Sequence, residues 1–374
     1  METSFLESRL EESSHEPPTY NMEPSRSLAR PVDRDSTSQG DGDDAGGLEM
    51  WGWSGNLTDW SPEQKSLLLS SWRPSTLKTY KVAWNRWCRW AHDNDLNISS
   101  PTGSSLARFL SDLHQKEGLA YSTILVHKSV VSSLCDADKS EALSSHKLVK
   151  QVLKAIALQK PKEPKPPIWD VANLVLFLSS RKFQQDNLYE VARHTAALLL
   201  LCSGRRVHDL TLLCIDSDHM TDMGSHIILW PRFGSKTDSS DTRQSGWKLL
   251  PNTQCNQADP IYWIKQLIEI SRQRREVCKS SKLFLTVIGK PREASRTIIA
   301  GWVKSLLREA GIEATPGSVR AAVASRNWID NFPLDSILQQ GNWRSEDTFR
   351  RFYRREISRA DHNVNNLSNL FEGV

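Results

Sequence analysis

A short proline-rich segment, residues 160–167, constrains the folding of this chain more than any other feature. It reads Lys-Pro-Lys-Glu-Pro-Lys-Pro-Pro and so contains four prolines. Proline lacks a backbone N–H and disfavours the α conformation of the residue before it, so no helix continues through this stretch. The sequence therefore predicts an extended linker, residues 161–168, between two separately folded domains.

The chain of 374 residues is long enough for two globular domains, each with its own core. Residues 1–62 are rich in Ser, Glu, Asp, Gly and Pro and lack apolar periodicity, which predicts a disordered acidic and polar segment. Residues 63–160 are predicted to form a helical domain, and residues 169–360 a larger domain of mixed structure. Residues 361–374 are expected to form a C-terminal tail.

Apolar side chains in the first domain recur at steps of three and four residues, the spacing of one face of a helix. Ser104 and Ser105 are candidate caps at the start of the second of these stripes. The pattern predicts four helices, marked by Leu77, Tyr80, Trp84, Trp87 and Ala91, by Leu106, Phe109, Leu110 and Leu113, by the run from Ile124 to Leu134, and by Leu148, Val152 and Ile156.

The second domain is predicted to combine helices with a few strands. Gly204 suits the C-cap of its second helix. Two strand candidates, His226–Pro231 and Gly246–Leu250, enclose a polar loop that contains Lys236. The remainder, to about residue 359, predicts short helices joined by tight turns. The longer helices are expected over residues 170–180, 187–202, 260–276 and 296–309.

The formal net charge of +4 conceals an asymmetry along the chain. Residues 1–50 carry a balance of −8, so residues 51–374 carry +12. A basic body fits a polyanionic partner, although charge alone fits solvated surface lysines and arginines equally well. Lys160, Lys162 and Lys165 of the linker suit contact with a phosphate backbone, and a plain spacer has the same composition.

The sequence lacks the features of a membrane-spanning or signal-directed chain. It has no run of eighteen or more apolar residues, and its acidic, polar start is unlike a signal peptide. The six cysteines are scattered, with no C-x-x-C pair and no His cluster at metal-ligand spacing. They are expected to be reduced intracellular thiols, mostly in the core, and no metal site is expected.

Four separated segments hold residues suited to phosphate chemistry. In the first, Arg205 and Arg206 follow a glycine cap at the start of a helix, where unpaired N–H groups and the helix dipole favour an anion. In the second, Lys236 stands in the small-residue turn Gly234–Thr237 between the two strand candidates. Taken singly, each has an ordinary interpretation, an arginine without a role or a solvated hairpin lysine.

The other two segments lie nearer the C-terminus. Arg320 stands near the start of an Ala-rich helix, whose small residues permit close packing behind it. The turn Gly341–Arg344 leads through the cap candidate Ser345 into a helix that carries Tyr353. A tyrosine at such a place is ordinarily a core residue with its hydroxyl bonded to backbone.

In this order the four segments resemble the motifs of the tyrosine recombinase (phage integrase-like) family. That family shows a T-G-x-R-x-x-E-L box, a lysine in a β-hairpin, an H-x-x-R box, a G-H or G-W turn and a following tyrosine. The resemblance covers roughly residues 73–360, and the last box is most similar to those of DIRS-type retrotransposon and crypton recombinases. It implies a catalytic set with a tyrosine nucleophile, formed by Arg206, Lys236, Arg320, Trp343 and Tyr353, with Asp209 in the acidic position of the first box.

Two departures from the family pattern bear on activity. The histidine of the H-x-x-R box is expected at position 317, where this chain has Gly317. The distance from Trp343 to Tyr353 is one residue longer than in many bacterial members, so either Asn342 or Trp343 faces the phosphate. Trp343 is favoured, because an indole N–H is a good single donor to a phosphate oxygen.

The resemblance implies a mainly α (α+β) fold. An N-terminal helical core-binding (SAM-like) domain would precede a C-terminal mixed helical catalytic domain with a small antiparallel sheet. The implied activity is that of a site-specific DNA recombinase or integrase, which cuts and rejoins double-stranded DNA through a 3′-phosphotyrosyl link without metal, ATP or another cofactor. The residues expected to contact DNA are Lys160, Lys162, Lys165, Arg205 and Arg344.

The resemblance also implies an assembly and a place in the cell. The protein is expected to act as a homo-oligomer, a dimer to tetramer, on DNA, with no membrane partner. Its expected role is the integration of a mobile element. It is expected to be nuclear if that element is eukaryotic, and otherwise intracellular with DNA.

Three alternatives stay open from the sequence. Because Gly317 replaces the expected histidine, one is a recombinase descendant that binds DNA but cuts it poorly. An all-helical scaffold that matches the motifs by chance is disfavoured by the order of the boxes and the strand signals between them. A type IB topoisomerase shares the chemistry, but the short spacing of the boxes and the small N-terminal domain favour a recombinase.

Overall fold

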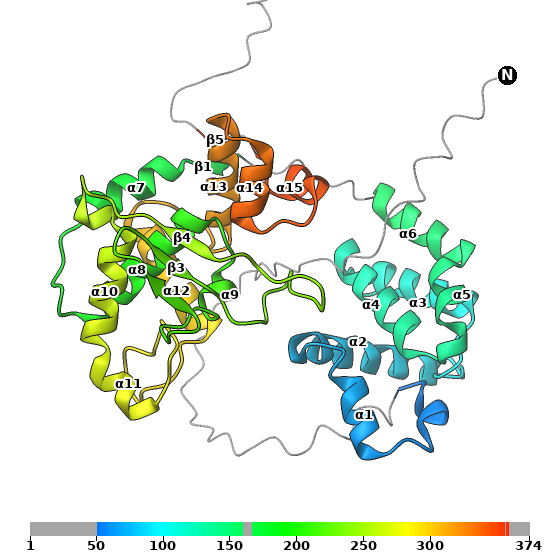
Figure 1. Ribbon diagram of the computed structural model, residues 1–374. Coiled ribbons are helices and arrows are strands. Elements are labelled where there is room, and N and C mark those ends of the chain that lie inside the picture. The colour runs from blue at the N-terminus through cyan, green and yellow to red at the C-terminus, as the bar shows by residue number, and fades with distance from the viewer. Residues whose placement is uncertain (1–50, 160–166, 356, 359–374) are drawn as a thin grey trace, which may run out of the picture. The chain divides into compact units, whose positions relative to one another are not determined.

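The computed structural model describes residues 51–159, 167–355 and 357–358 (Figure 1). The chain divides into two compact units, residues 1–163 and 164–374, and the division falls within the proline-rich segment. Each unit has a hydrophobic core of its own. Lys160, Lys162 and Lys165, predicted to contact DNA, lie outside the described residues.

The first unit is a bundle of helices around a tryptophan-rich core. Trp87 is fully buried on α2, and its indole N–H donates to the Ile98 carbonyl at 2.9 Å. The ring of Trp87 lies 5.2 Å from that of Phe109 on α3, in the edge-to-face arrangement that aromatic pairs favour. The elements are η2 (Ser54–Leu57), α1 (Pro62–Leu69), α2 (Pro74–Asp93), α3 (Gly103–Gln115), α4 (Tyr121–Leu134), η3 (Ala137–Lys139), α5 (Ser140–Ser145) and α6 (Lys147–Gln159).

The four predicted helices of this unit are confirmed, with three corrections. The ordered structure begins before residue 63, because Trp51 and Leu57 are buried in the core. The cap of α3 is Thr102, with Ser105 as its reciprocal partner in the capping box. The stripe predicted for α6 is right at Ile156, which is buried, and at Val152, which packs partly buried against the core, but it is wrong at Leu148.

The buried residues of α6 are Val149, Leu153 and Ile156, whereas Leu148 is 50% exposed. Both Leu148 and Val149 are apolar, so periodicity could not decide which of the two faces the bundle.

The second unit is built around α8 (Leu188–Ser203), which is buried from Val191 to Leu200. Helices α10 and α12 pack against it (Figure 1). The single helix predicted over 260–276 is two helices that meet at Ser271, whose hydroxyl donates to the Leu267 carbonyl and competes with the helical pattern. The helices of this unit are α7 (Val171–Ser180), α8, α9 (Val207–Leu210), η4 (Asn256–Ala258), α10 (Pro260–Ile270), α11 (Arg272–Cys278), α12 (Arg296–Glu309), α13 (Ser318–Ile329), α14 (Leu334–Gly341) and α15 (Glu346–Phe352).

A small antiparallel sheet of order β2-β3-β4 covers part of this core. Its strands are β2 (Met220–Asp222), β3 (Ile227–Leu229) and β4 (Trp247–Leu249), with Leu229 paired to both Met220 and Trp247. In β3 and in β4 the first and last residues are buried and the middle residue is not. This alternation is typical of a strand that packs one face on the core. The two predicted strands are confirmed, and β2 is too short and polar to give a pattern.

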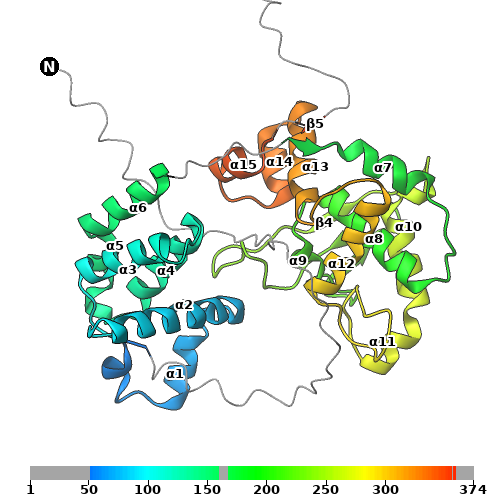
Figure 2. The ribbon, with the colours of Figure 1, turned by 180° about the vertical axis from the view of Figure 1, so that it is seen from behind.

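Two strands from opposite ends of the second unit pair in parallel. They are β1 (Ile168–Trp169) and β5 (Ile357–Ser358), and they lie beside α13 (Figure 1; β5 and α13 are also labelled in Figure 2). The Trp169 indole N–H donates to the Ser318 hydroxyl at 2.8 Å, which fixes β1 to the first turn of α13. This pair follows from the folding of the whole unit and has no local pattern in the sequence. None of the described helices combines the length and apolar character needed to cross a membrane.

The orientation of α6 makes a paired test of the first unit possible. Val149→Asp should lower the free energy of unfolding by several kcal/mol, because it buries an unpaired carboxylate. Leu148→Asp should change it by no more than about 0.5 kcal/mol, since that side chain is half exposed. Urea denaturation of the full chain measures both, and equal losses would contradict the orientation of the helix.

Candidate active site

Arg320 occupies the centre of the candidate site. It lies in the first turn of α13, where Ala321, Ala322 and Ala324 are buried and let neighbouring elements approach. The Arg320 side chain is 3% exposed. Its Nη1 donates to the Gly204 carbonyl at 2.9 Å and to the Gly341 carbonyl at 2.5 Å. One guanidinium thus joins three segments that are far apart in the sequence.

Arg206 reaches the same place from the turn after α8. Gly204 ends α8 in the left-handed conformation, at φ +60°, as its C-cap prediction required. The chain then turns directly into α9, with Arg206 as its N-cap. The buried carboxylate of Asp209 accepts the Arg206 backbone N–H at 3.1 Å and the Ser235 hydroxyl at 2.8 Å. Asp209 therefore connects the first arginine to the loop that carries Lys236.

Trp343 and Tyr353 pack around the same guanidinium. Asn342 ends α14 in the left-handed conformation, and the Trp343 ring then lies 3.8 Å from the Arg320 guanidinium carbon. Tyr353, half-buried just after α15, places its ring 4.9 Å from that carbon and 5.0 Å from the Trp343 ring. Ser345 accepts from the Thr348 backbone N–H at the start of α15, which confirms the predicted cap.

Several N–H donors of the site are buried and have no hydrogen-bond partner among the described residues. They are Arg206 Nη1, Arg320 Nε, Arg320 Nη2 and Trp343 Nε1. Buried polar groups in folded proteins are nearly always paired, so unpaired donors from three side chains around one point suit an anionic ligand. The Tyr353 hydroxyl lies near enough to favour the charged form of Arg320, but no hydrogen bond of good geometry joins it to Nε or Nη2.

The charge of Arg320 is poorly compensated within the protein. Burial and the like charge of Arg206 lower the pKa of Arg320 to about 9. The group stays cationic at neutral pH, and both causes of the lowered pKa would be offset by an anion bound between the two arginines. The site is therefore built to receive a negatively charged group beside a tyrosine hydroxyl.

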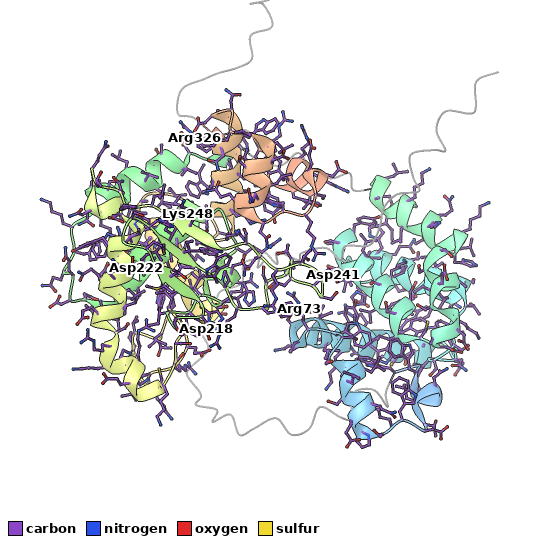
Figure 3. All side chains as sticks on the ribbon, viewed as in Figure 1. Arg73, Asp218, Asp222, Asp241, Lys248 and Arg326 are labelled. Atoms are coloured by element: carbon purple, nitrogen blue, oxygen red, sulfur yellow. The ribbon has the colours of Figure 1, made fainter. Side chains whose placement is uncertain are left out.

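Lys236 stands exposed in a turn of the loop between β3 and β4. This loop extends from the sheet and includes Asp241, labelled in Figure 3. Asp238 holds its near end, because one carboxylate oxygen accepts the backbone N–H groups of Gly234 and Ser235 at 2.9 and 2.8 Å. The predicted position of Lys236 between two strands is confirmed.

Two arginines predicted to contact DNA are bound within the protein. Arg205 is 3% exposed, and its guanidinium donates to the Gln340 carbonyl at 2.5 Å and to the Ser245 hydroxyl at 2.7 Å. The structure thus gives it a structural role in place of the predicted surface contact, because the turn after Gly204 points Arg205 inward. Arg344 is exposed, but its Nη2 donates to the Thr237 carbonyl and, at 2.8 Å, to the Thr242 hydroxyl.

Gly317 stands at the position where the resemblance places a histidine. Gly317 is exposed at the N-cap of α13 with φ −67°, and a Cβ placed there meets no atom within 4 Å.

The roles of Ser235, Thr237 and Asn342 were not predicted from the sequence. The only available signal was that Ser235 and Thr237 flank Lys236 in a turn of small polar residues. Within the described part of the chain, no three His, Cys, Asp or Glu side chains converge on a metal site.

Several solved structures resemble this chain. The integrase of transposon Tn1549 in complex with transposon right end DNA is 16% identical, over 83% of this chain and 95% of that one, with a TM-score of 0.51. The same integrase in complex with a circular intermediate DNA gives 14% identity, coverage of 87% and 98%, and a TM-score of 0.50. The XerH site-specific recombinase bound to difH substrate is 13% identical over 79% of each chain, with a TM-score of 0.48. No family model and no curated protein matches the chain.

These likenesses, at low sequence identity, show the fold. The chain has the mainly helical fold of tyrosine recombinases, with a small antiparallel sheet in the second unit. The predicted fold class is thereby confirmed.

The contact between Gly341 and Trp343 gives a test of the site's packing. A Cβ on Gly341 would lie 1.9 Å from Cζ3 of Trp343, so Gly341→Ala must displace the ring that stacks on Arg320. We expect a loss of about 1–3 kcal/mol in the free energy of unfolding, the usual cost of overpacking. The matched control is Gly301→Ala in α12, where a Cβ meets nothing within 4 Å and where a gain of about 0.5–1 kcal/mol is expected. Differential scanning fluorimetry measures both, and a Gly341→Ala protein as stable as the parent would refute the contact.

Proposed function

We propose that this protein is a tyrosine-type site-specific DNA recombinase, in which Tyr353 forms a covalent link to a DNA phosphate. The observation that carries the proposal is the set of buried, unpaired N–H donors of Arg206, Arg320 and Trp343 beside the tyrosine. Such donors, already oriented, suit a phosphate whose negative charge grows during the reaction. The shared fold supports the same assignment.

In the proposed reaction the Tyr353 oxygen attacks phosphorus, and its proton passes to solvent water as the new P–O bond forms. Arg206 and Arg320 hold the non-bridging oxygens and stabilise the added charge of the transition state. The bond from phosphorus to the 5′ oxygen breaks, and Lys236 protonates that oxygen as it leaves. Attack on the phosphotyrosine by another strand's 5′ hydroxyl reverses these steps and reseals the DNA, so the bond energy is conserved.

The finer assignment follows from the resemblance of the last sequence box. We propose a recombinase like those of DIRS-type retrotransposons and cryptons, which integrates a mobile element and acts in the nucleus of a eukaryotic host. The Tn1549 integrase is a transposon protein solved with transposon DNA, and the lambda integrase has been solved as a dimer and as a tetramer on DNA. A dimer to tetramer on double-stranded DNA is proposed here by analogy.

One observation favours a second candidate function, a recombinase-derived DNA-binding protein that cuts poorly. Gly317 offers no side chain at the position where the family places a histidine. A positioned imidazole typically contributes about 10²–10⁴-fold in rate through proton transfer. The two candidates differ in whether a covalent adduct forms.

The nucleophile can be tested by covalent trapping. A nicked duplex carrying the DNA that flanks the coding sequence of this chain should trap the protein on a 3′ phosphate, because the cleaved fragment diffuses away. Tyr353→Phe should abolish the adduct, since its hydroxyl is the group that attacks. Tyr262→Phe is the matched control and should leave the adduct intact, because Tyr262 lies on α10 with its hydroxyl bound to Gln185 at 2.9 Å. Denaturing gel electrophoresis and peptide mapping read the result, and an adduct on Tyr262 would show the assignment to be wrong.

The missing histidine can be tested by restoring it. Gly317→His should speed adduct formation by about tenfold or more, because the backbone there accepts a side chain and an imidazole adds a donor at the phosphate. Gly317→Ala is the matched control, which adds a Cβ without the imidazole and should leave the rate unchanged. Single-turnover trapping with the same nicked duplex gives the rates. An adduct formed by Gly317→His but not by the parent chain would favour the second candidate function.

A further inference from the structure

The turn that carries Lys236 is anchored on both sides of the lysine. On one side the Ser235 hydroxyl, fully buried, donates to the Asp209 carboxylate at 2.8 Å. On the other side Thr237 receives two bonds from the segment after α14, one at its hydroxyl from the Asn342 amide and one at its carbonyl from Arg344. Lys236 thus stands between a residue held by the first box and a residue held by the last.

The two anchors differ in how much else supports them. Ser235 is also fixed by Asp238, which binds its backbone N–H within the loop. Beyond Thr237 the chain runs through Ser240, Asp241 and Thr242, which are exposed. Exposed loop segments order themselves only through such contacts, because each ordered residue loses conformational entropy. The second anchor therefore adds a connection between the turn and the segment after α14, which the bond from Ser235 to Asp209 does not provide.

Arg344 is well suited to this task. Besides the Thr237 carbonyl, its guanidinium reaches the Thr242 hydroxyl at 2.8 Å, so it spans two points of the loop. Its neighbour Trp343 stacks on Arg320, so the backbone that holds Arg344 is fixed to the phosphate-binding arginine. To move Lys236, the protein would therefore have to break the hydrogen bonds of Arg344 that hold the loop against the segment after α14.

We infer that Arg344 and Asn342 are positioning residues that hold Lys236 in place to protonate the leaving 5′ oxygen. The inference deepens the proposed function and rests on it. It differs from the DNA contact predicted for Arg344 from the sequence, because the arginine acts through Thr237 on the lysine. A general acid must lie within hydrogen-bond reach of the atom it protonates, so a loosened turn costs rate without any loss of phosphate binding.

A substrate with sulfur in place of the bridging 5′ oxygen separates this role from others. Sulfur leaves without a general acid, so it restores cleavage to a protein that lacks only that acid. Arg344→Ala should slow cleavage of the oxygen substrate by about tenfold or more, and should cleave the sulfur substrate at nearly the parent rate. Lys236→Ala should show the same pattern. The double variant should be no slower on the oxygen substrate than Lys236→Ala alone, because both changes remove one function.

Two further variants guard against effects of folding and charge. Asn342→Gly removes the amide that binds Thr237 but keeps the left-handed backbone, φ +56°, that glycine adopts freely, and should also be rescued by sulfur. Arg350→Ala removes the same charge from an exposed arginine on α15, which pairs with Glu346, and should leave both substrates unaffected.

The possible outcomes distinguish a failure of this inference from a failure of the proposed function. If Arg344→Ala loses equal rate on both substrates while its thermal stability is unchanged, Arg344 contacts DNA and the positioning role is overturned. If the parent chain cleaves neither substrate, the proposed function fails and the positioning role falls with it. Hydrogen exchange of residues 235–243 tests the anchor apart from activity: faster exchange in Arg344→Ala is expected, and unchanged exchange would overturn the inference.

Discussion

The second unit depends on one buried guanidinium, that of Arg320, and on the two carbonyls it binds. Because Nη1 donates to both Gly204 and Gly341, the turn after α8 and the end of α14 are held at a fixed separation. Left unpaired, a cation at 3% exposure would cost several kcal/mol, so these bonds stabilise the fold as well as the site. They use only one nitrogen, and Nε and Nη2 remain for a ligand.

The surroundings of Arg320 explain why the chain has small or left-handed residues where it does. Gly341 has no side chain because Trp343 lies directly on its backbone, and Asn342 takes the left-handed turn that brings the ring there. The Trp343 ring in turn offers its face to the guanidinium, a contact that helps to compensate a buried charge. Packing and charge are thus satisfied by the same residues.

The sequence predicted most of the helices and the order of the site residues. It failed where two adjacent residues are alike and only the structure shows which one points inward. The stripes of α2 and α3 were clear because their apolar residues recur at steps of three and four, whereas Leu148 and Val149 are adjacent and both apolar. Arg205 and Arg206 are likewise adjacent; the resemblance assigned Arg206 to the site, but only the geometry after Gly204 shows that Arg205 points inward. The Thr237 contacts join segments over a hundred residues apart, so no local pattern could indicate them.

The parallel pair of β1 and β5 has a consequence for the order of folding. Ile168 precedes every described helix of the second unit, and its partner Ile357 follows all of them. Contacts between such distant residues form late, because closing a long loop costs entropy that only a nearly complete core offsets. Since β5 comes four residues after Tyr353, we expect the tyrosine to be secured late, after Arg320 is buried. In a partly folded chain Tyr353, the proposed nucleophile, would therefore lie away from the arginines proposed to assist it.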